Sequence, residues 1–212
     1  MSGRRLREII GAFSSVGLTS IIEKGKATED KSTPRKLRLA FEKLGPSFVK
    51  IGQILSTRSD LFPEAYVKEL SKLQSNVLPL PTELVMEAIS DELSGPVSAY
   101  FTEITPEPLA SGSVAQTHRA RLLNGRDVII KIQRPHLPEI IEQDLTLLIR
   151  LSRRVPKALL PMVNLPEVLQ QIKESLTREI DFRNEAQAMI TFAELNQNVK
   201  CVAIPEVYDE FT

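Results

Sequence analysis

The sequence predicts an α+β fold, in which a helical N-terminal part precedes a small antiparallel sheet and further long helices. Apolar residues recur at helical spacing as far as about Pro96. After that point strand-like runs alternate with turn signals, and helical spacing returns from Leu137. These changes of period divide the chain into residues 1–33 (an amphipathic helix and a polar linker), residues 34–95 (a helical region) and residues 96–212 (strands with long helices).

The composition is that of an ordinary globular protein, with 42% hydrophobic and 25% charged residues. The 27 lysines and arginines balance the 27 aspartates and glutamates, so the formal net charge is zero. Because nucleic-acid binding depends mainly on phosphate neutralisation, this balance argues against a nucleic-acid partner. Cys201 is the single cysteine, which excludes an internal disulfide framework and favours a reducing, intracellular setting.

The first region combines arginines with an apolar helical period. Leu6, Ile10, Phe13, Gly17 and Ile21 would share one face of a helix. Two interpretations follow: a helix that packs on the rest of the fold, which we favour, or a basic amphipathic helix on a membrane surface. No apolar run approaches the roughly 18 residues of a membrane-spanning helix. Polar residues dilute this segment and no cleavage pattern follows it, so we do not expect a signal peptide.

Proline and glycine mark the helices of the second region. The predicted elements are a helix from Pro34 to Leu44, a helix from Pro46 through Asp60, a helix opening at Pro63, a rigid connector over residues 77–81, and a helix capped by Thr82 that ends near Gly95.

The second of these helices carries a polar pair around a glycine. Lys50 and Gln53 lie three residues apart and share a face. Gly52 costs about 1 kcal/mol relative to alanine in a helix, so its presence indicates close approach of another element. On these residues alone, a helix with a solvated polar stripe is the simpler interpretation.

The third region begins with strands and ends with helices. We expect strands over residues 99–104, 113–122 and 127–132, a loop over residues 106–112, helices over Leu137–Arg154 and Asn164–Asn196, and a last strand over Lys200–Ala203. Asn124-Gly125 predicts a type I′ hairpin turn, because both central residues of that turn need positive φ.

Lys131 is the first candidate functional residue, because it interrupts the apolar run Val-Ile-Ile-Lys-Ile. Burying an ammonium group without a partner costs several kcal/mol, so this lysine either points outward from an edge or is paired. A loop of small residues, Ala110-Ser111-Gly112-Ser113, precedes the hairpin. Loop, strand, hairpin and strand with a central lysine is the layout of a kinase nucleotide lobe. A solvent-facing edge lysine explains Lys131 equally well.

A lysine in that role needs a carboxylate on a helix to hold it. Glu179 lies in the long helix predicted after Asn164, and Asp181 follows two residues later on a different helical face. A helical glutamate considered alone is usually solvated.

Taken together, these segments resemble the UbiB-like atypical kinases, the group that includes bacterial UbiB and the mitochondrial ADCK proteins. FVKIGQIL resembles their KxGQ signature, PLASGSVAQTHRARL their alanine-rich loop, DVIIKIQRP their lysine strand and REIDFRNEA their ExD segment. The order and spacing agree from about Leu37 to Tyr208, and the resemblance to bacterial UbiB is the closest.

This resemblance implies a KxGQ helical region followed by a protein-kinase-like N-lobe with a long αC-type helix. Lys131 would contact the phosphates of ATP or ADP, bound with Mg²⁺, and would pair with Glu179. Residues 110–113 would approach the nucleotide, and Asp181 would face the KxGQ helix. Lys50, Gly52 and Gln53 would lie across the mouth of the site.

The resemblance also implies a role and a location. The family supports ubiquinone biosynthesis, so the implied partners are a nucleotide and quinone-biosynthesis enzymes or a quinone precursor. The implied location is the bacterial cytoplasm, with peripheral contact at the inner membrane left open.

Two departures from the family pattern modify these expectations. Gly112 stands where the family has alanine, and glycine frees the backbone there. The hinge strand, the catalytic-loop aspartate and the metal-binding aspartate would all follow Thr212, so we expect no catalytic residue and no metal ligand within this chain. Asp181-Phe182-Arg183 mimics a metal-binding motif by chance, and we interpret His118 as a strand residue.

Two functions therefore remain open from the sequence. The chain is either the N-terminal portion of a UbiB-like atypical kinase or ATPase, or a non-catalytic module that binds a membrane or a partner. In isolation we expect it to hydrolyse ATP negligibly and to bind nucleotide weakly.

Overall fold

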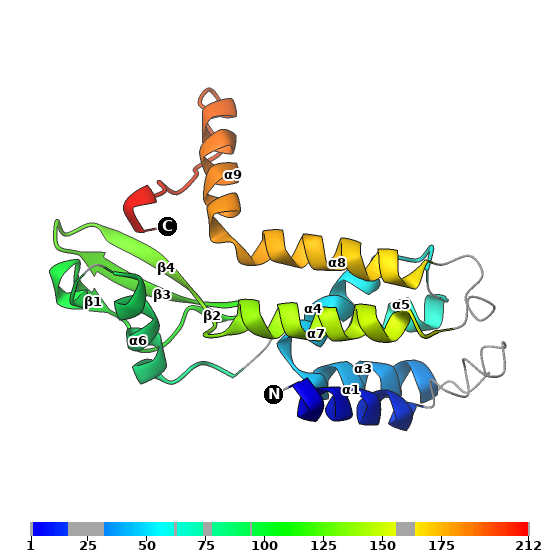
Figure 1. Cartoon of the computed structure of the whole chain (residues 1–212). Helices are drawn as coiled ribbons and strands as arrows, with labels where there is room; N and C mark the ends of the chain where they lie inside the picture. Colours follow the sequence, from blue (N-terminus) through cyan, green and yellow to red (C-terminus); the bar gives the residue numbers. More distant parts are fainter. Residues whose placement is uncertain are drawn as a thin grey trace.

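A computed structural model of the chain describes residues 2–16, 32–61, 63–73, 78–93, 95–155 and 164–211. A stack of helices forms one part of the molecule, a small sheet covered by one helix forms the other, and α9 projects away from the end of α8 (Figure 1). The α-helices of the described residues are α1 (Ser2–Val16), α3 (Ser32–Leu44), α4 (Pro46–Leu55), α5 (Glu64–Leu70), α6 (Thr82–Glu92), α7 (Leu137–Ser152), α8 (Leu165–Ile180) and α9 (Phe182–Leu195). The strands are β1 (Phe101–Ile104), β2 (Ala110–Ser111), β3 (Ala115–Leu122) and β4 (Asp127–Gln133), and two short 3₁₀ helices are η1 (Val97–Ala99) and η3 (Asp209–Phe211).

The larger hydrophobic core joins helices from both ends of the sequence. Phe48 of α4, Leu145 of α7 and Leu176 of α8 are fully buried in it. In Figure 1, α7 and α8 lie beside the helices of the N-terminal region. Helix α4 is therefore held against α8, which leads directly into α9.

Helix α1 packs on this core, as the interpretation that we favoured expects. Its buried residues include Ile9 and Val16, whereas Ile10 is 46% exposed. The predicted apolar face was therefore wrong by one residue at Ile9 and Ile10, because the real stripe runs through Leu6, Ile9, Phe13 and Val16. Gly17 and Ile21, which the prediction also placed on that face, lie outside the described residues.

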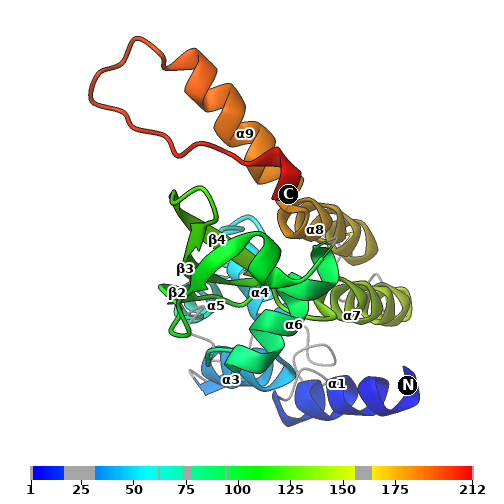
Figure 2. The same ribbon diagram turned by 90° about the vertical axis from the view of Figure 1, so that its left-hand side faces the viewer.

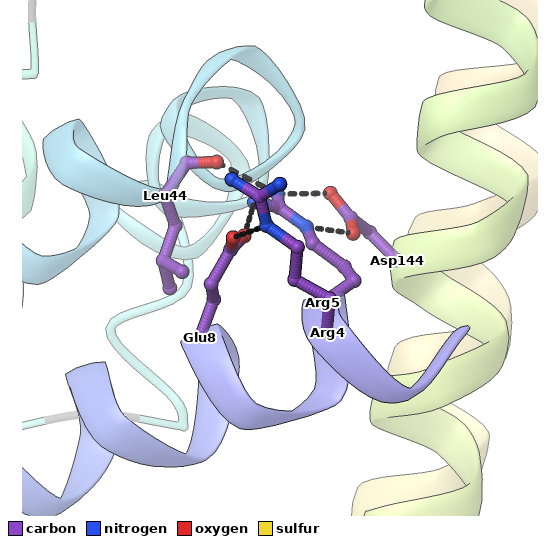
Figure 3. Close-up of polar contacts among 5 residues, drawn as sticks. All are labelled: Arg4, Arg5, Glu8, Leu44 and Asp144. Carbon is purple, nitrogen blue, oxygen red and sulfur yellow. Dashed lines mark hydrogen bonds and ion pairs between the residues drawn. The ribbon is translucent and has the colours of Figure 1, made fainter. Parts of the chain in front are cut away.

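An ion pair fixes α1 to α7 (Figure 3). Arg5 Nε and Nη2 donate to the two carboxylate oxygens of Asp144, each at 2.7 Å, and Nη2 also donates to the Leu44 carbonyl at 2.7 Å. Asp144 is only 1% exposed. The hydrogen bond that Arg5 donates to Asp144 is the main cause that raises the pKa of Arg5. The bidentate geometry satisfies a buried carboxylate that would otherwise be costly.

The antiparallel sheet is centred on β3. Strand β4 pairs along one edge of β3, with Thr117 opposite Lys131, while β1 and β2 pair with successive parts of the other edge. The β3–β4 turn is not type I′, because only Gly125 has positive φ, at 82°. Hydrogen bonds from the Gly125 amide to Leu122 O and from the Leu122 amide to Arg126 O describe a three-residue loop with a glycine bulge instead.

Helix α6 covers one face of the sheet and leaves the opposite face open (Figure 2). Val85 and Ile89 of α6 pack with sheet residues that include Leu122 and Ile132. Strand β4 therefore alternates, and Ile129 on the other face is 60% exposed. The apolar run around Lys131 is therefore not buried throughout, and Lys131 lies on the open face with Ile129.

Several predicted boundaries differ from the structure. The helix predicted over Asn164–Asn196 is two helices, because Asp181 has extended backbone angles between α8 and α9. No strand forms over Lys200–Ala203, and the helix from Pro46 ends at Leu55. Pro81, not Thr82, caps α6, which ends at Glu92. The division into three regions stays a prediction. Within the described ranges, no helix is long and apolar enough to cross a bilayer.

Candidate nucleotide site

Lys131 extends from the open face of β4 and meets two residues at the start of α9. Its Nζ forms an ion pair with Glu185 and lies 4.4 Å from the centre of the Phe182 ring. The Lys131 side chain is 37% exposed. The ammonium group is therefore paired and also accessible to solvent, which combines the two alternatives that the sequence left open.

Glu179 is not the partner of Lys131, which corrects the pairing that the resemblance implied. Glu179 lies in the last turn of α8 and forms an ion pair with Lys50 of α4. The bend at Asp181 explains the difference, since it sends the chain in a new direction after Ile180. Glu185 then reaches Lys131 from the first turn of α9, where the helix dipole favours an acidic side chain.

Asp181 caps α9. Its carboxylate accepts a hydrogen bond from the Arg183 amide at 3.2 Å and bonds from the Arg183 guanidinium at 2.8 Å. The bond from the Arg183 side chain is the main cause that lowers the pKa of Asp181. Asp181 thus stabilises the bend that separates Glu179 from Glu185.

Gly52 and Gln53 contact the elements that pack against α4. A Cβ atom added to Gly52 would lie 2.2 Å from Leu73 Cδ1 and 2.7 Å from Phe41 Cδ2. The predicted close approach of another element at Gly52 is therefore confirmed. Gln53 donates to the Leu73 carbonyl at 3.1 Å. Lys50, the other member of the polar pair, contacts Glu179 of α8 close to the bend at Asp181.

The loop of small residues lies one strand away from β4. Ala110 and Ser111 form β2, which pairs with β3, and the Gly112 amide donates to the Ala115 carbonyl at 2.8 Å. Ser113 is buried. Gly112 does not have positive φ, and a Cβ atom there would lie 3.4 Å from Ala115 O. The family's alanine would therefore fit this backbone.

Sequence reasoning missed the residues that hold this loop. Arg134 Nε donates to Gly112 O at 2.9 Å, and its Nη2 donates to Ser111 Oγ at 2.9 Å. Burial lowers the pKa of Arg134. Its position directly after a strand is the only sequence signal, and an arginine at a strand end is usually solvated.

Two buried residues of β3 continue the network. The Leu80 amide donates to Gln116 Oε1 at 2.7 Å, and Gln116 Nε2 lies 2.8 Å from His118 Nε2. His118 Nδ1 lies 2.7 Å from Thr105 O, which can only accept. His118 is therefore a structural strand residue whose Nδ1 carries the proton. Within the described ranges, no three acidic, histidine or cysteine side chains gather as a metal site.

An accessible lysine paired with a helix carboxylate, on the open face of an antiparallel sheet and one strand away from a loop of small residues, matches the layout of a kinase-like N-lobe. Residues 72–212 match the ABC1 atypical kinase-like domain, and the chain belongs to this family. This assignment supports the resemblance to the UbiB and ADCK proteins at the level of the family.

Two similar proteins illustrate the family. A protein from Clostridium pasteurianum, described as an uncharacterized protein in the hydrogenase 1 5′ region, is 40% identical over 97% of this chain and 39% of its own length. Rv3197 of Mycobacterium tuberculosis, solved in complex with erythromycin, is 30% identical over 71% of this chain and 38% of its own, with a TM-score of 0.51. The chain thus spans about two fifths of the length of each.

The ABC1 kinase-like family generally binds ATP with Mg²⁺. Two features fit the phosphate part of such a ligand, because Lys131 on the open face offers an accessible cation and residues 110–113 offer a backbone with small side chains. No acidic cluster among the described residues fits the metal.

Proposed function

We propose that this chain forms the phosphate side of the nucleotide site of an ABC1-family atypical kinase or ATPase. The observation that carries the proposal is the Lys131–Glu185 ion pair on the open face of the sheet, one strand away from Ala110 and Ser111. Family membership supports it independently.

Each residue would have a separate role in binding ATP or ADP. Lys131 would contact phosphate oxygens, while Glu185 and the Phe182 ring would hold its ammonium group in place. Residues 110–113 would let the backbone approach the phosphates. Bound Mg²⁺ would neutralise phosphate charge, and we assign no metal ligand to the described residues. Lys50 and Glu179 would fix α8, and with it the start of α9.

A finer proposal concerns the biological role. The resemblance of the KxGQ and ExD segments to UbiB supports a function in ubiquinone or another prenyl-quinone pathway, with quinone-biosynthesis enzymes or a quinone precursor as partners. It also supports a bacterial cytoplasmic location. The outward residues of α1, including Arg4 and the partly exposed Ile10, would suit peripheral contact with the inner membrane. Restoration of ubiquinone in a bacterial strain lacking UbiB, by expression of this protein, would test this role.

Nucleotide affinity of the chain, measured by calorimetry with ATP and Mg²⁺, tests the main proposal. Lys131→Ala should weaken binding by about tenfold or more, because it removes the cation that faces the phosphates. Lys173→Ala is the matched control, since Lys173 forms a similar exposed ion pair with Glu142 between α7 and α8. Equal affinity of the wild type and Lys131→Ala would instead favour a non-catalytic membrane- or partner-binding module.

A further inference from the structure

Arg134 joins two segments that lie far apart in the sequence. It follows the last residue of β4, three positions after Lys131. In addition to its bonds with Ser111 and Gly112, its Nη2 donates to the Leu78 carbonyl at 3.0 Å. Leu78 belongs to the segment that enters α6 from the helical region. The guanidinium group therefore lies between the loop of small residues and this segment.

Gln116 connects the same two segments a second time. Its Oε1 accepts from the Leu80 amide at 2.7 Å and from Ser111 Oγ at 3.4 Å. Ser111 Oγ accepts from Arg134 and donates to Gln116, so the hydrogen bonds run in one direction from Arg134 to Gln116. Gln116 is fully buried, which shields this connection from water.

The chemistry of Arg134 suits a role in holding the loop without opposing a bound anion. Within the ranges that the structure describes, it forms no ion pair with a carboxylate, and the acceptors of its hydrogen bonds are two carbonyls and a hydroxyl. A carboxylate at this place would repel phosphate, whereas neutral acceptors leave the positive charge of the guanidinium in effect. The planar fork of arginine also satisfies acceptors in several directions at once, which a lysine cannot do.

We propose that Arg134 is a positioning residue for phosphate binding, which fixes the backbone of Ser111 and Gly112 to the segment Leu78–Leu80. This inference rests on the proposed nucleotide site. It adds that contacts with the segment Leu78–Leu80 help to fix the backbone conformation of the loop of small residues. Nucleotide bound at the loop should therefore protect Leu80, although Leu80 has no place in the site itself.

Hydrogen exchange of the whole chain without ligand tests the first part of the inference. Arg134→Gln and Arg134→Lys should both speed exchange of the Leu80 and Gly112 amides, which donate to Gln116 and to Ala115. Exchange in α7 and α8 should stay unchanged, which reports an intact core. Arg126→Gln is the matched control, since Arg126 lies just before β4 and pairs with the exposed Glu206. Unchanged exchange of both amides would overturn the proposal.

The same variants with MgATP test the positioning role. Wild-type chain should show slower exchange at Leu80 when ATP is bound, and both Arg134 variants should lose this protection and about tenfold in affinity. A lysine that restores wild-type affinity would show that charge alone acts, which overturns positioning. If Arg134→Gln fails to fold, Ser111→Ala removes the shared hydroxyl more mildly and should reduce the protection of Leu80.

Failure of the proposed function gives a different result. If the wild type binds no ATP and Lys131→Ala changes nothing, both proposals fall. If Lys131→Ala loses affinity while the Arg134 variants keep it, the nucleotide site stands and only the role of Arg134 is overturned.

Discussion

Among single residues, Asp144 combines nearly complete burial with a bidentate bond to a side chain from another element. Asp144→Ala should lower the free energy of unfolding by about 3 kcal/mol, because it leaves the Arg5 guanidinium without its main partner. Glu142→Ala on the same helix breaks an exposed ion pair with Lys173 and should cost less than about 1 kcal/mol. Urea unfolding of both variants measures the difference, and equal losses would contradict the assigned role of the buried pair.

Phe182 offers a second prediction at this scale, because its ring lies beneath the Lys131 ammonium group. Phe182→Leu should weaken ATP binding by roughly fivefold, since a cation–π contact contributes about 1 kcal/mol. Phe182→Tyr keeps the ring and should bind ATP as the wild type does. Titration calorimetry of the three proteins distinguishes the cation–π contact from the effect of side-chain size. A tyrosine variant that binds ATP as weakly as the leucine variant would refute the prediction.

At the scale of elements, the sequence predicted the starts of most helices and the β3–β4 hairpin, because proline, glycine and apolar spacing act locally. It did not predict the bend at Asp181. An aspartate within a helical period is usually solvated, and its capping of α9 depends on where Arg183 lies after the bend. The wrong partner for Lys131 follows from this one omission.

The residues that hold the loop were missed for a related reason. Lys131 and the small residues of positions 110–113 are unusual in their local sequence, so they could be found without a structure. Arg134 and Gln116 are ordinary polar residues at ordinary strand positions. Their importance depends on contacts with Leu78 and Leu80, which only the folded chain brings near.

Glycine positions in two helices give opposite predictions for the same substitution. Gly52→Ala should destabilise the protein by about 1–3 kcal/mol, because the new Cβ would overlap Leu73 and Phe41 across the helix contacts of α4. Gly11→Ala in α1 meets nothing within 4 Å and should stabilise it by about 0.5–1 kcal/mol through helix propensity. Thermal unfolding of both variants checks the signs of the two stability changes. A stabilising Gly52→Ala would contradict the prediction, because it would show that the Leu73 and Phe41 side chains move aside without cost.

At the scale of the whole molecule, exposed ion pairs predict how stability depends on pH. Hydrogen bonds from Arg5, Lys72 and Lys173 are the main causes that lower the pKa values of Glu8, Glu69 and Glu142. A carboxylate with a lowered folded-state pKa binds fewer protons when folded than when unfolded. Its stabilisation is therefore complete above the ordinary glutamate pKa of about 4.3 and is lost as pH falls through the lower folded value.

We therefore expect the urea concentration at the unfolding midpoint to decrease when the pH is lowered from 6 to about 3.5. High salt should reduce the size of this change, because these pairs are exposed and screened. Unfolding curves at both pH values, in low and high salt, measure it. A midpoint that rises as the solution is acidified would contradict the assigned pairs.

Because the helix breaks between α8 and α9, electrostatic contacts on either side of the break help to fix the orientation of α9. Lys50 anchors the last turn before the break and Lys131 the first turn after it. A continuous helix would carry torque along its hydrogen bonds. Here the Lys131–Glu185 ion pair and the Phe182 ring hold α9 to the sheet, and the bond from Asn184 Nδ2 to the Arg178 carbonyl at 3.0 Å holds it to α8. The ion pair weakens with ionic strength, whereas Ile172 and Leu176 keep α8 in the core. We expect α9 to swing more widely in concentrated salt than in dilute buffer, with α8 as its fixed pivot.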